Sequence, residues 1–511
     1  MHQISRSRRT LRLTILVAAL AACTLSAPTT AARPPQLAVF SRHPAEARRL
    51  PAFDSEAAHS RQAFRKEPYL LFTGDPDAMD VHWQLHAAAP CTIDWGLDTG
   101  YSLGSEVTIE HGDDHQHTHK FTGLAPSTLY FYQVRSGGEA KPGSFRSPPA
   151  PDETRLKFFA YGDTRSFPED HDAVAARMVD VFQADAEFQT LTLHVGDLVD
   201  NGELEEHWDE QFFDPVYADI AQLHANLPTQ AARGNHERDA VLYAKYFPYP
   251  FVMSRAWSFD YGPAHFVVVD QYIGYGPSSQ QLAWVENDLA TTDRPWKFMV
   301  VHEPGWSAGG HENDPDVQGH LHPLCVRYGV RILFAGHNHY YARAIVDSVH
   351  HVTTGGGGAP LYAPDNQYPH LVAIAKDYHY CTIEIDGDSL TYATVNCLGE
   401  TLDWFPRPAT GVAEGLPEVS ALHLDAPAPS PSASETQLSF TLSEPMRVEL
   451  AVYDVGGRLV RSLLAKDFPV GEHSASWDGK SDAGERVASG VYFARLSGPR
   501  DSATRRIVRL R

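Results

Sequence analysis

Short apolar runs recur through the middle of the chain, and a polar motif follows most of them. The runs cover residues 156–160, 191–195, 266–269, 297–301 and 331–335. Between them lie stretches with helical periodicity, such as 279–289 and 321–328, the second of which ends before Gly329. Strands that alternate with helices predict a layered α/β core. In such a core, reactive side chains gather at the carboxyl ends of the strands.

Five polar motifs stand at or near these predicted strand ends. One such motif alone is usually a helix cap or a turn, but five in sequence indicate a common site. Asp, Asn and His side chains together are the ligands that a pair of metal cations needs. The motifs are Gly162-Asp163-Thr164-Arg165, Gly196-Asp197-Leu198-Val199-Asp200, Gly234-Asn235-His236-Glu237, Val301-His302-Glu303-Pro304 and Gly336-His337-Asn338-His339.

The flanks of the chain have a different pattern, with alternating apolar and polar residues between Gly, Pro and Asp turns. This alternation is typical of short antiparallel strands in β-sandwiches. Segments rich in Pro, Ala and Ser separate these regions. A length of 511 residues suits about three domains at ~150 residues each. We therefore expect a signal peptide at 1–32, a linker at 33–66, a β-sandwich at 67–150, the α/β domain at 151–402, a linker at 403–434 and a second sandwich at 435–511.

The first segment has the composition of an export signal. Four arginines, the last being Arg12, precede an apolar run over residues 13–22, and small residues follow. This pattern predicts a signal peptide and an exported protein, located in a periplasm, on a cell surface or outside the cell. Two finer alternatives stay open. Arg8-Arg9 suits a twin-arginine signal, and Leu20-Ala21-Ala22-Cys23 suits a lipoprotein site that would attach Cys23 to a membrane.

Charge and cysteine content narrow the classes of partner. A formal net charge of -22 disfavours nucleic acid as a partner or substrate. Four cysteines beyond the leader match no zinc motif, although Cys381 and Cys397 flank a predicted hairpin where one disulfide would fit. The alternating His115, His117 and His119 would share one strand face, which suits either a metal site or an exposed polar edge.

With these motifs, residues 156 to about 400 resemble the calcineurin-like metallophosphoesterase superfamily, near the purple acid phosphatases in domain arrangement. The segment 120–130 resembles fibronectin type III domains. The segment 453–460, with Trp477-Asp478-Gly479, resembles the immunoglobulin-like modules of FlgD or type IX sorting proteins, which suggests surface attachment. The resemblance implies an α/β fold with a four-layer β-sandwich metallophosphoesterase core, flanked by two all-β sandwich domains.

The resemblance also implies two metal ions per chain, which would be iron, zinc or manganese. It implies hydrolysis of small phosphate monoesters by a hydroxide that bridges the metals. Phosphodiester or nucleotide pyrophosphate hydrolysis is the alternative reaction, and a surface adhesion protein with a decayed site is the alternative outside enzymes. Asp163 and His339 would bind the first metal, Asp197 would bridge both, and Asn235, His302 and His337 would bind the second. His236 would be catalytic, with Glu237 orienting it. Arg165, to which the resemblance assigns no role, is the third catalytic candidate.

This chain departs from the family pattern at two positions. Arg165 stands where the first motif usually ends in His, and Asp200 stands where purple acid phosphatases have a Tyr ligand. The charge-transfer iron site of those enzymes is therefore not expected. Two roles for Arg165 stay open: a bidentate contact to phosphate, or an ion pair with an acid such as Asp200.

Overall fold

The computed structural model describes residues 63–112, 114–407, 422–424, 427, 432, 435–442, 445–454, 458–469, 471–498 and 502–510. The expected signal peptide, Cys23 and most of both expected linkers lie outside these residues. No helix among the described residues is long and apolar enough to cross a membrane.

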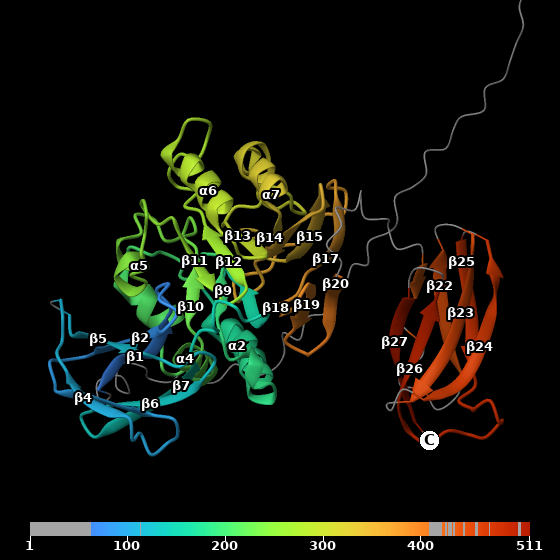
Figure 1. The fold of residues 1–511 in the computed structure, drawn as a ribbon, viewed down its shortest axis with the longest axis horizontal. Coiled ribbons are helices and arrows are strands. Elements are labelled where there is room, and N and C mark those ends of the chain that lie inside the picture. The colour runs from blue at the N-terminus through green and yellow to red at the C-terminus, as the bar shows by residue number, and fades with distance from the viewer. Residues whose placement is uncertain are drawn as a thin grey trace, which may run out of the picture.

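The N-terminal region is a β-sandwich of two antiparallel sheets (Figure 1). Tyr130 Oη accepts a hydrogen bond from Ala125 N at 2.9 Å, a corner found in immunoglobulin-like sandwiches. One sheet has the order β1-β2-β5 and the other β4-β3-β6-β7. The strands are β1 (Phe64–Leu71), β2 (Ala78–Leu85), β3 (Cys91–Gly96), β4 (Gly104–Thr108), β5 (Gln116–Thr122), β6 (Leu129–Ser136) and β7 (Glu139–Arg146).

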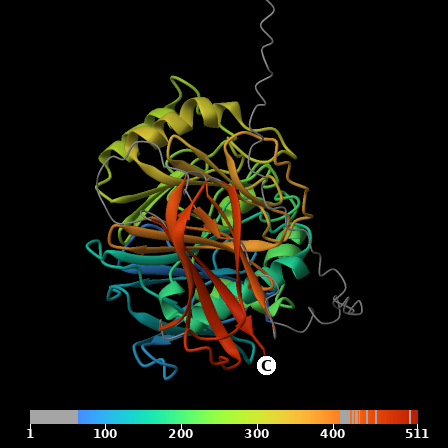
Figure 2. The same ribbon diagram turned by 90° about the vertical axis from the view of Figure 1, so that its right-hand side faces the viewer.

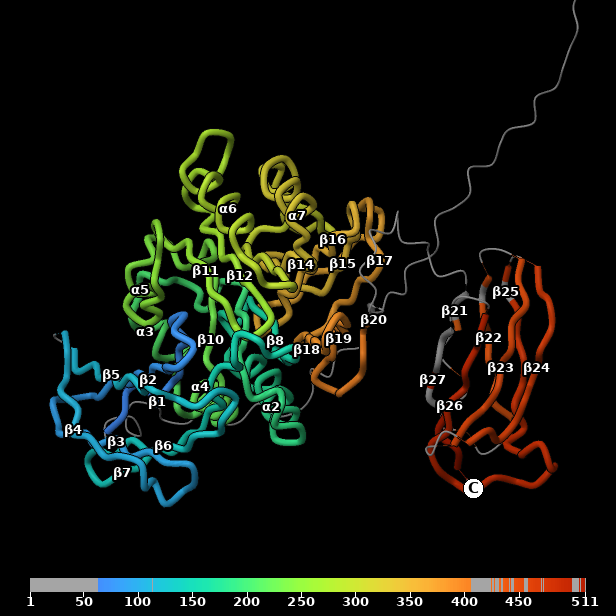
Figure 3. The backbone as a smooth tube through the Cα atoms, in the orientation of Figure 1, coloured from blue at the N-terminus to red at the C-terminus, as the bar shows by residue number. Residues whose placement is uncertain are grey.

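The central region contains two facing sheets, the first with the order β10-β9-β8-β18-β19-β20 (Figure 3). Its strands are β8 (Arg155–Tyr161), β9 (Thr192–His194), β10 (Thr229–Ala231), β18 (His379–Asp386), β19 (Ser389–Asn396) and β20 (Thr401–Arg407). The second sheet has the order β11-β12-β13-β14-β16-β15-β17. Its strands are β11 (Trp257–Tyr261), β12 (Ala264–Val268), β13 (Trp296–Val300), β14 (Val330–Ala335), β15 (Tyr341–Val346), β16 (Val349–Thr354) and β17 (Leu371–Ala375).

Helices cover the outer faces of both sheets, which gives the four layers expected from the sequence. α6 (Gln280–Thr291) and α7 (His322–Tyr328) lie at the top of the domain and α2 (Pro168–Ala184) on the opposite side in two perpendicular views (Figures 1 and 2). Ser279 caps α6, and Gly329 ends α7 in the left-handed conformation that glycine adopts readily. The remaining helical segments are η1 (Ala186–Phe188), α3 (Glu205–His207), η2 (Trp208–Phe212), α4 (Ala218–Asn226), α5 (Val241–Tyr246) and η3 (Val317–Leu321).

Aromatic side chains fill the space between the two central sheets. Phe158 of β8 packs edge-on against Phe266 of β12 and Phe298 of β13, with ring centroids 5.3 Å apart in both pairs. Phe72 of the N-terminal sandwich extends the same core by packing against Phe259 and Tyr261. The sandwich and the α/β region therefore share one apolar core, which favours a fixed arrangement of the two.

The C-terminal module is a third sandwich with its own apolar core around Trp477. Its sheets have the orders β21-β22-β25 and β24-β23-β26-β27. The strands are β21 (Leu422–Leu424), β22 (Thr436–Leu442), β23 (Met446–Asp454), β24 (Leu459–Phe468), β25 (Gly471–Trp477), β26 (Gly490–Ser497) and β27 (Ser502–Arg509).

Two strands extend across expected domain boundaries, and a third lies inside an expected linker. β1 begins at Phe64, inside the expected first linker, and β20 continues to Arg407 inside the expected second linker. β21 lies in the same linker and pairs with β22. β1, β20 and β21 are edge strands, and each pairs on one side only, with the strand next to it in the sequence.

Two minor expectations are corrected. His117 and His119 are buried, not exposed: His117 stacks on Trp83, and His119 packs against Trp95. Neither belongs to a cluster with metal-ligand spacing among the described residues. Cys381 and Cys397 do flank the β18–β19 hairpin, but both are free thiols.

Candidate metal centre

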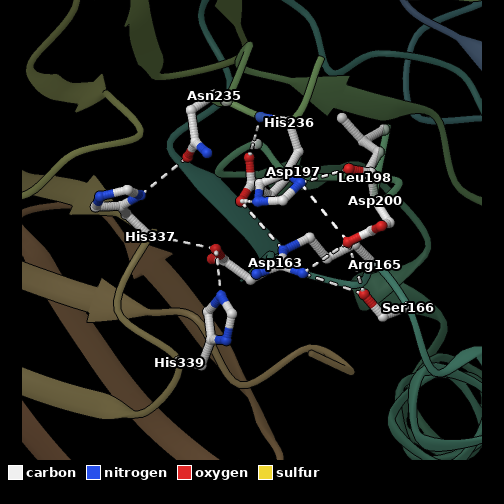
Figure 4. A network of polar contacts seen from close by, with 12 residues as sticks. Asp163, Arg165, Ser166, Asp197, Leu198, Asp200, Asn235, His236, His337 and His339 are labelled. Atoms are coloured by element: carbon white, nitrogen blue, oxygen red, sulfur yellow. Dashed lines mark hydrogen bonds and ion pairs between the residues drawn. The ribbon is translucent and has the colours of Figure 1, made fainter. Parts of the chain in front are cut away.

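The polar motifs converge because the strands before them run parallel within each sheet. β8, β9 and β10 are parallel neighbours, as are β12, β13 and β14, so their carboxyl ends open at one edge of the layered domain. The motif side chains project together from this edge (Figure 4). Asp163 follows β8, Asp197 follows β9, Asn235 and His236 follow β10, His302 follows β13, and His337 and His339 follow β14.

Three of these residues have left-handed backbone conformations. The φ angles are 57° at Asp163, 55° at Asp197 and 67° at His337. Asp and His are among the side chains that tolerate this region best, although each instance costs about 1–3 kcal/mol. Hydrogen bonds hold the turns: His337 N donates to Asp163 Oδ1 at 2.9 Å, and His236 N donates to Asp197 Oδ1 at 3.0 Å.

One group of potential ligands consists of Asp163, Asp197 and His339, whose ligand atoms all lie within 4.8 Å of one another. His339 Nδ1 lies 2.9 Å from Pro360 O, so this nitrogen carries the proton and donates it to the carbonyl. The lone pair of neutral His339 is then on Nε2, which lies 3.6 Å from Asp163 Oδ1. Asp163 Oδ2 is buried and has no hydrogen-bond donor.

A second group consists of Asp197, His302 and His337, and it shares Asp197 with the first. His302 Nδ1 donates to Val195 O at 2.8 Å, which leaves Nε2 as the ligand atom. Asn235 Oδ1 lies 3.0 Å from both His302 Nε2 and His337 Nδ1. Asn235 thus lies beside both imidazole rings of this group and could complete a cation site with them.

The acidity of the cluster also fits cation binding. Burial, reinforced by Asp197, raises the pKa of Asp163 to about 8. Burial lowers the pKa values of His337 to about 2 and of His339 to about 4, so both rings are neutral. Burial would also lower the pKa of His302, but Asp197 outweighs it and raises that pKa to about 10. Metal binding at Asp163 and His302 would therefore release protons, which makes metal affinity depend on pH.

Glu237 serves a different purpose from the expected one. Its buried carboxylate accepts hydrogen bonds from the backbone amides of Gly234 at 2.6 Å, Leu198 at 2.8 Å and Asp197 at 3.0 Å. The expectation that Glu237 orients the His236 ring is therefore corrected. Glu237 fixes the loops that carry Asp197 and Asn235, because three amides of those loops point at it.

Asp200 orients both other residues expected to meet the substrate. His236 Nδ1 donates to Asp200 O at 2.5 Å, so Nε2 faces the cluster, 3.8 Å from Asp197 Oδ2. Arg165 Nη1 donates to Asp200 Oδ1 at 3.0 Å, while Arg165 Nε lies 3.5 Å from Asp197 Oδ2 (Figure 4). The ion pair between Arg165 and Asp200 is present, and the guanidinium still borders the cluster.

Two aromatic residues beside the cluster have a weaker signal in the sequence. The His311 ring lies 4.0 Å from that of His337, and the Tyr362 ring stacks on His339 at 4.2 Å. His311 suits an ordinary loop residue when judged by sequence alone, and Tyr362 lies in no motif. The nearby run 355–358 does pack closely, since a methyl group on Gly355 would overlap Asn338 O.

The layered fold and this cluster define the class of the central region, which is that of a metallophosphoesterase domain. Residues 156–341 match the family model described as calcineurin-like phosphoesterase. Residues 66–147 match the purple acid phosphatase N-terminal domain, and residues 428–501 match the FlgD Ig-like domain.

Among similar proteins, probable purple acid phosphatase 20 of Arabidopsis thaliana is 24% identical over 298 residues, covering 52% of this chain and 66% of that protein. This is just under two thirds of its length. A nucleotide pyrophosphatase/phosphodiesterase of Hordeum vulgare is 26% identical over 299 residues, covering 47% of this chain and 79% of that protein.

Two solved structures share the fold. A purple acid phosphatase from seeds of yellow lupin, Lupinus luteus, superimposes with a TM-score of 0.55 at 20% identity, covering 68% of this chain and 77% of that one. PhoD superimposes with a TM-score of 0.52 at 13% identity, covering 69% of this chain and 94% of that one.

Proposed function

We propose that this protein is an exported phosphatase that hydrolyses small phosphate monoesters at a centre of two metal ions. The observation that carries the proposal is Asp197, which belongs to both groups of potential ligands. A shared carboxylate is what two neighbouring cations need in order to act on one phosphoryl group. Asp163 and His339 would complete one site, and Asn235, His302 and His337 would complete the other.

Two bound cations would neutralise the charge of the phosphate. They would also lower the pKa of a nearby water, so that hydroxide is available as the nucleophile. The residues of the chain bind and orient the ester. Arg165, held by Asp200, presents a planar guanidinium that suits a pair of phosphoryl oxygens. His236 has its Nδ1 proton fixed on Asp200 O, so a protonated ring points its Nε2 proton toward the cluster. That proton would pass to the leaving oxygen.

A second candidate reaction is hydrolysis of diesters or nucleotide pyrophosphates. It is supported by the barley relative, whose name is nucleotide pyrophosphatase/phosphodiesterase. The same metals and the same roles for Arg165 and His236 serve either reaction. The metal is iron, zinc or manganese in this proposal, since carboxylate, amide and imidazole ligands accept all three.

The deciding experiment combines elemental analysis with hydrolysis of p-nitrophenyl phosphate and bis(p-nitrophenyl) phosphate. The wild-type protein should bind about two metals per chain and cleave the monoester faster. Asp197→Asn should lose metal and reduce kcat by at least about 100-fold, since a neutral amide holds two cations poorly. Asp180→Asn, an exposed surface change, is the control.

Different outcomes separate the alternatives. Faster cleavage of the diester would favour the second reaction. A wild-type protein that binds no metal after incubation with iron, zinc or manganese would leave the adhesion protein with a decayed site as the better account.

Export and attachment are part of the proposal and rest on the leader and on the C-terminal module. Mass spectrometry of the mature protein from a bacterial host tests them. An N-terminus after the small residues 29–32 supports plain secretion, and a lipid-modified Cys23 supports membrane attachment. An unprocessed Met1 in the mature protein would contradict export.

A further inference from the structure

The segment from Asp200 to Phe212 links the metal centre to the N-terminal sandwich. It leaves the centre at Asp200, and Gly202 N donates to His236 O at 2.7 Å. It then forms α3 and η2, where the buried Trp208 donates from Nε1 to Gly202 O at 3.0 Å. This segment holds none of the proposed metal ligands, so it is able to affect the substrate side of the centre separately from the metals.

Gln211 of η2 braces the side of the centre that carries Arg165. Its Oε1 accepts hydrogen bonds from Asp200 N at 2.8 Å and from Ser166 N at 3.0 Å. Ser166 has a left-handed backbone, with φ 77°, and its position next to Arg165 makes that turn part of the guanidinium support. One amide oxygen therefore joins Asp200 to the residue that follows Arg165.

Lys66 of the sandwich holds the same segment from behind. Its side chain is fully buried, and its Nζ donates to Asp209, to Glu205 at 3.1 Å and to Gln84 at 2.7 Å. Arg65 adds a second bond to Asp209, from Nη2 at 2.6 Å. A buried ammonium group stays in place only when it is fully paired, so this contact fixes α3 and η2 against the sandwich.

We propose that the N-terminal sandwich positions the phosphate-binding side of the centre, with Lys66 and Gln211 as positioning residues. Lys66 holds Glu205 and Asp209, these fix η2, and Gln211 on η2 sets the place of Arg165 and Asp200. The ligand concerned is a phosphate group, either free or in a monoester. This inference rests on the proposed function, because it assigns Arg165 to phosphate binding.

The variants Lys66→Met and Gln211→Met test the inference, because both keep side-chain volume while removing the polar bonds. The control is Tyr132→Phe. It removes another bond between the sandwich and the α/β region, from Tyr132 Oη to Ala225 O at 2.8 Å, which does not involve the segment 200–212. Calorimetry measures the dissociation constant of inorganic phosphate on the metal-loaded protein. Metal content and the KM and kcat of p-nitrophenyl phosphate are measured beside it.

We expect each Met variant to raise the phosphate dissociation constant and KM by about fivefold, which corresponds to one ordinary hydrogen bond. Metal content should change little, since the ligands are untouched, and KM should change more than kcat. The double variant should bind phosphate no more weakly than the single variant with the larger dissociation constant, because Lys66 acts through Gln211. Tyr132→Phe should match the wild type in every measurement.

Several outcomes would overturn the inference. One is that the Met variants have the same phosphate dissociation constant as Tyr132→Phe. Another is that Gln211→Met loses metal. If Lys66→Met fails to fold, Arg65→Gln takes its place, since Arg65 is a partly exposed residue of the sandwich that also bonds Asp209. A wild-type protein that binds two metals but neither binds phosphate nor cleaves the ester would overturn the proposed function as well. If the wild type binds phosphate and the Met variants have the same dissociation constant, only the positioning role is contradicted.

Discussion

Gly336 lies so close to Asp163 that a methyl group on its α-carbon would overlap the carboxylate Oδ2. This is the buried oxygen that has no hydrogen-bond donor. The absence of a side chain at residue 336 therefore leaves the space in which the carboxylate stands.

Gly336→Ala should displace Asp163 and weaken metal binding without unfolding the protein. Because Asp163 belongs to only one group of ligands, we expect metal content to fall from about two toward one per chain. Elemental analysis checks this, with Gly319→Ala as the control, since nothing lies within 4 Å of a methyl group there. Full metal content in Gly336→Ala would show that Asp163 is able to move without loss of its ligand role.

Removal of metal should lower the melting temperature. Asp163 and Asp197 are buried side by side, and a bound cation would pair with both carboxylates in the folded protein only. Ligand linkage gives about 2.7 kcal/mol of stabilisation at a free metal concentration 100 times Kd. Thermal melts with a chelator, and after the metal is restored, measure the effect, which Asp197→Asn should abolish. Equal melting temperatures in the two wild-type samples would argue against a metal centre.

His265 should make stability depend on pH far from the metal centre. Burial lowers its pKa, but hydrogen bonds with Asp260 at 2.7 Å and Asp288 at 2.9 Å outweigh burial and raise it above 6.5. In the described contacts, the other charged group next to these three side chains is Arg294, whose Nε lies 3.1 Å from Asp260 Oδ2. A raised pKa means that the stabilisation is complete below pH 6.5 and is lost as the pH rises through the folded value.

The difference in melting temperature between the wild type and His265→Gln should therefore be largest at acidic pH and shrink as the pH increases. His320→Gln, in a more exposed pair with Asp316, should show a smaller difference throughout. A gap that widens with pH would mean that His265 is neutral in the folded protein.

Asp403 should be a major contributor to stability. It lies on β20 and accepts hydrogen bonds from Arg343 Nε and Tyr341 Oη of β15, both at 2.6 Å, so it joins the two central sheets. Breaking a buried pair by removing one partner costs about 3–5 kcal/mol. Asp403→Ala should lower the melting temperature by several degrees more than Asp388→Ala, which changes an exposed turn. Similar melting temperatures would indicate that β20 contributes little to the core.

The sequence predicts those parts of the fold that have local patterns. The five apolar runs correspond to β8, β9, β12, β13 and β14, and Ser279 and Gly329 mark helix ends where caps belong. The convergence of the polar motifs also follows, since parallel strands end at the same edge.

Contacts between distant segments escape sequence reasoning. Lys66 falls at the end of an expected linker, yet it is buried against Asp209, 143 residues away. Gln211 lies in no motif, and nothing in the sequence links it to Ser166. Glu237 shows a subtler limit: its place in the Gly-Asn-His-Glu motif suggests a role beside His236, whereas its three bonds are to backbone amides. Local spacing predicts which residues gather, but not which atoms they face.

The left-handed backbone at Asp163, Asp197 and His337 costs folding stability at the same three residues that supply the proposed ligands. A chain selected only for stability would place glycine there and relieve the strain of each turn. Because the ligands are held in tense turns before a cation arrives, metal capture needs little rearrangement. The rest of the fold therefore preorganises the metal centre. Stabilising changes elsewhere in the scaffold should therefore be tolerated more readily than any change that relaxes these three turns.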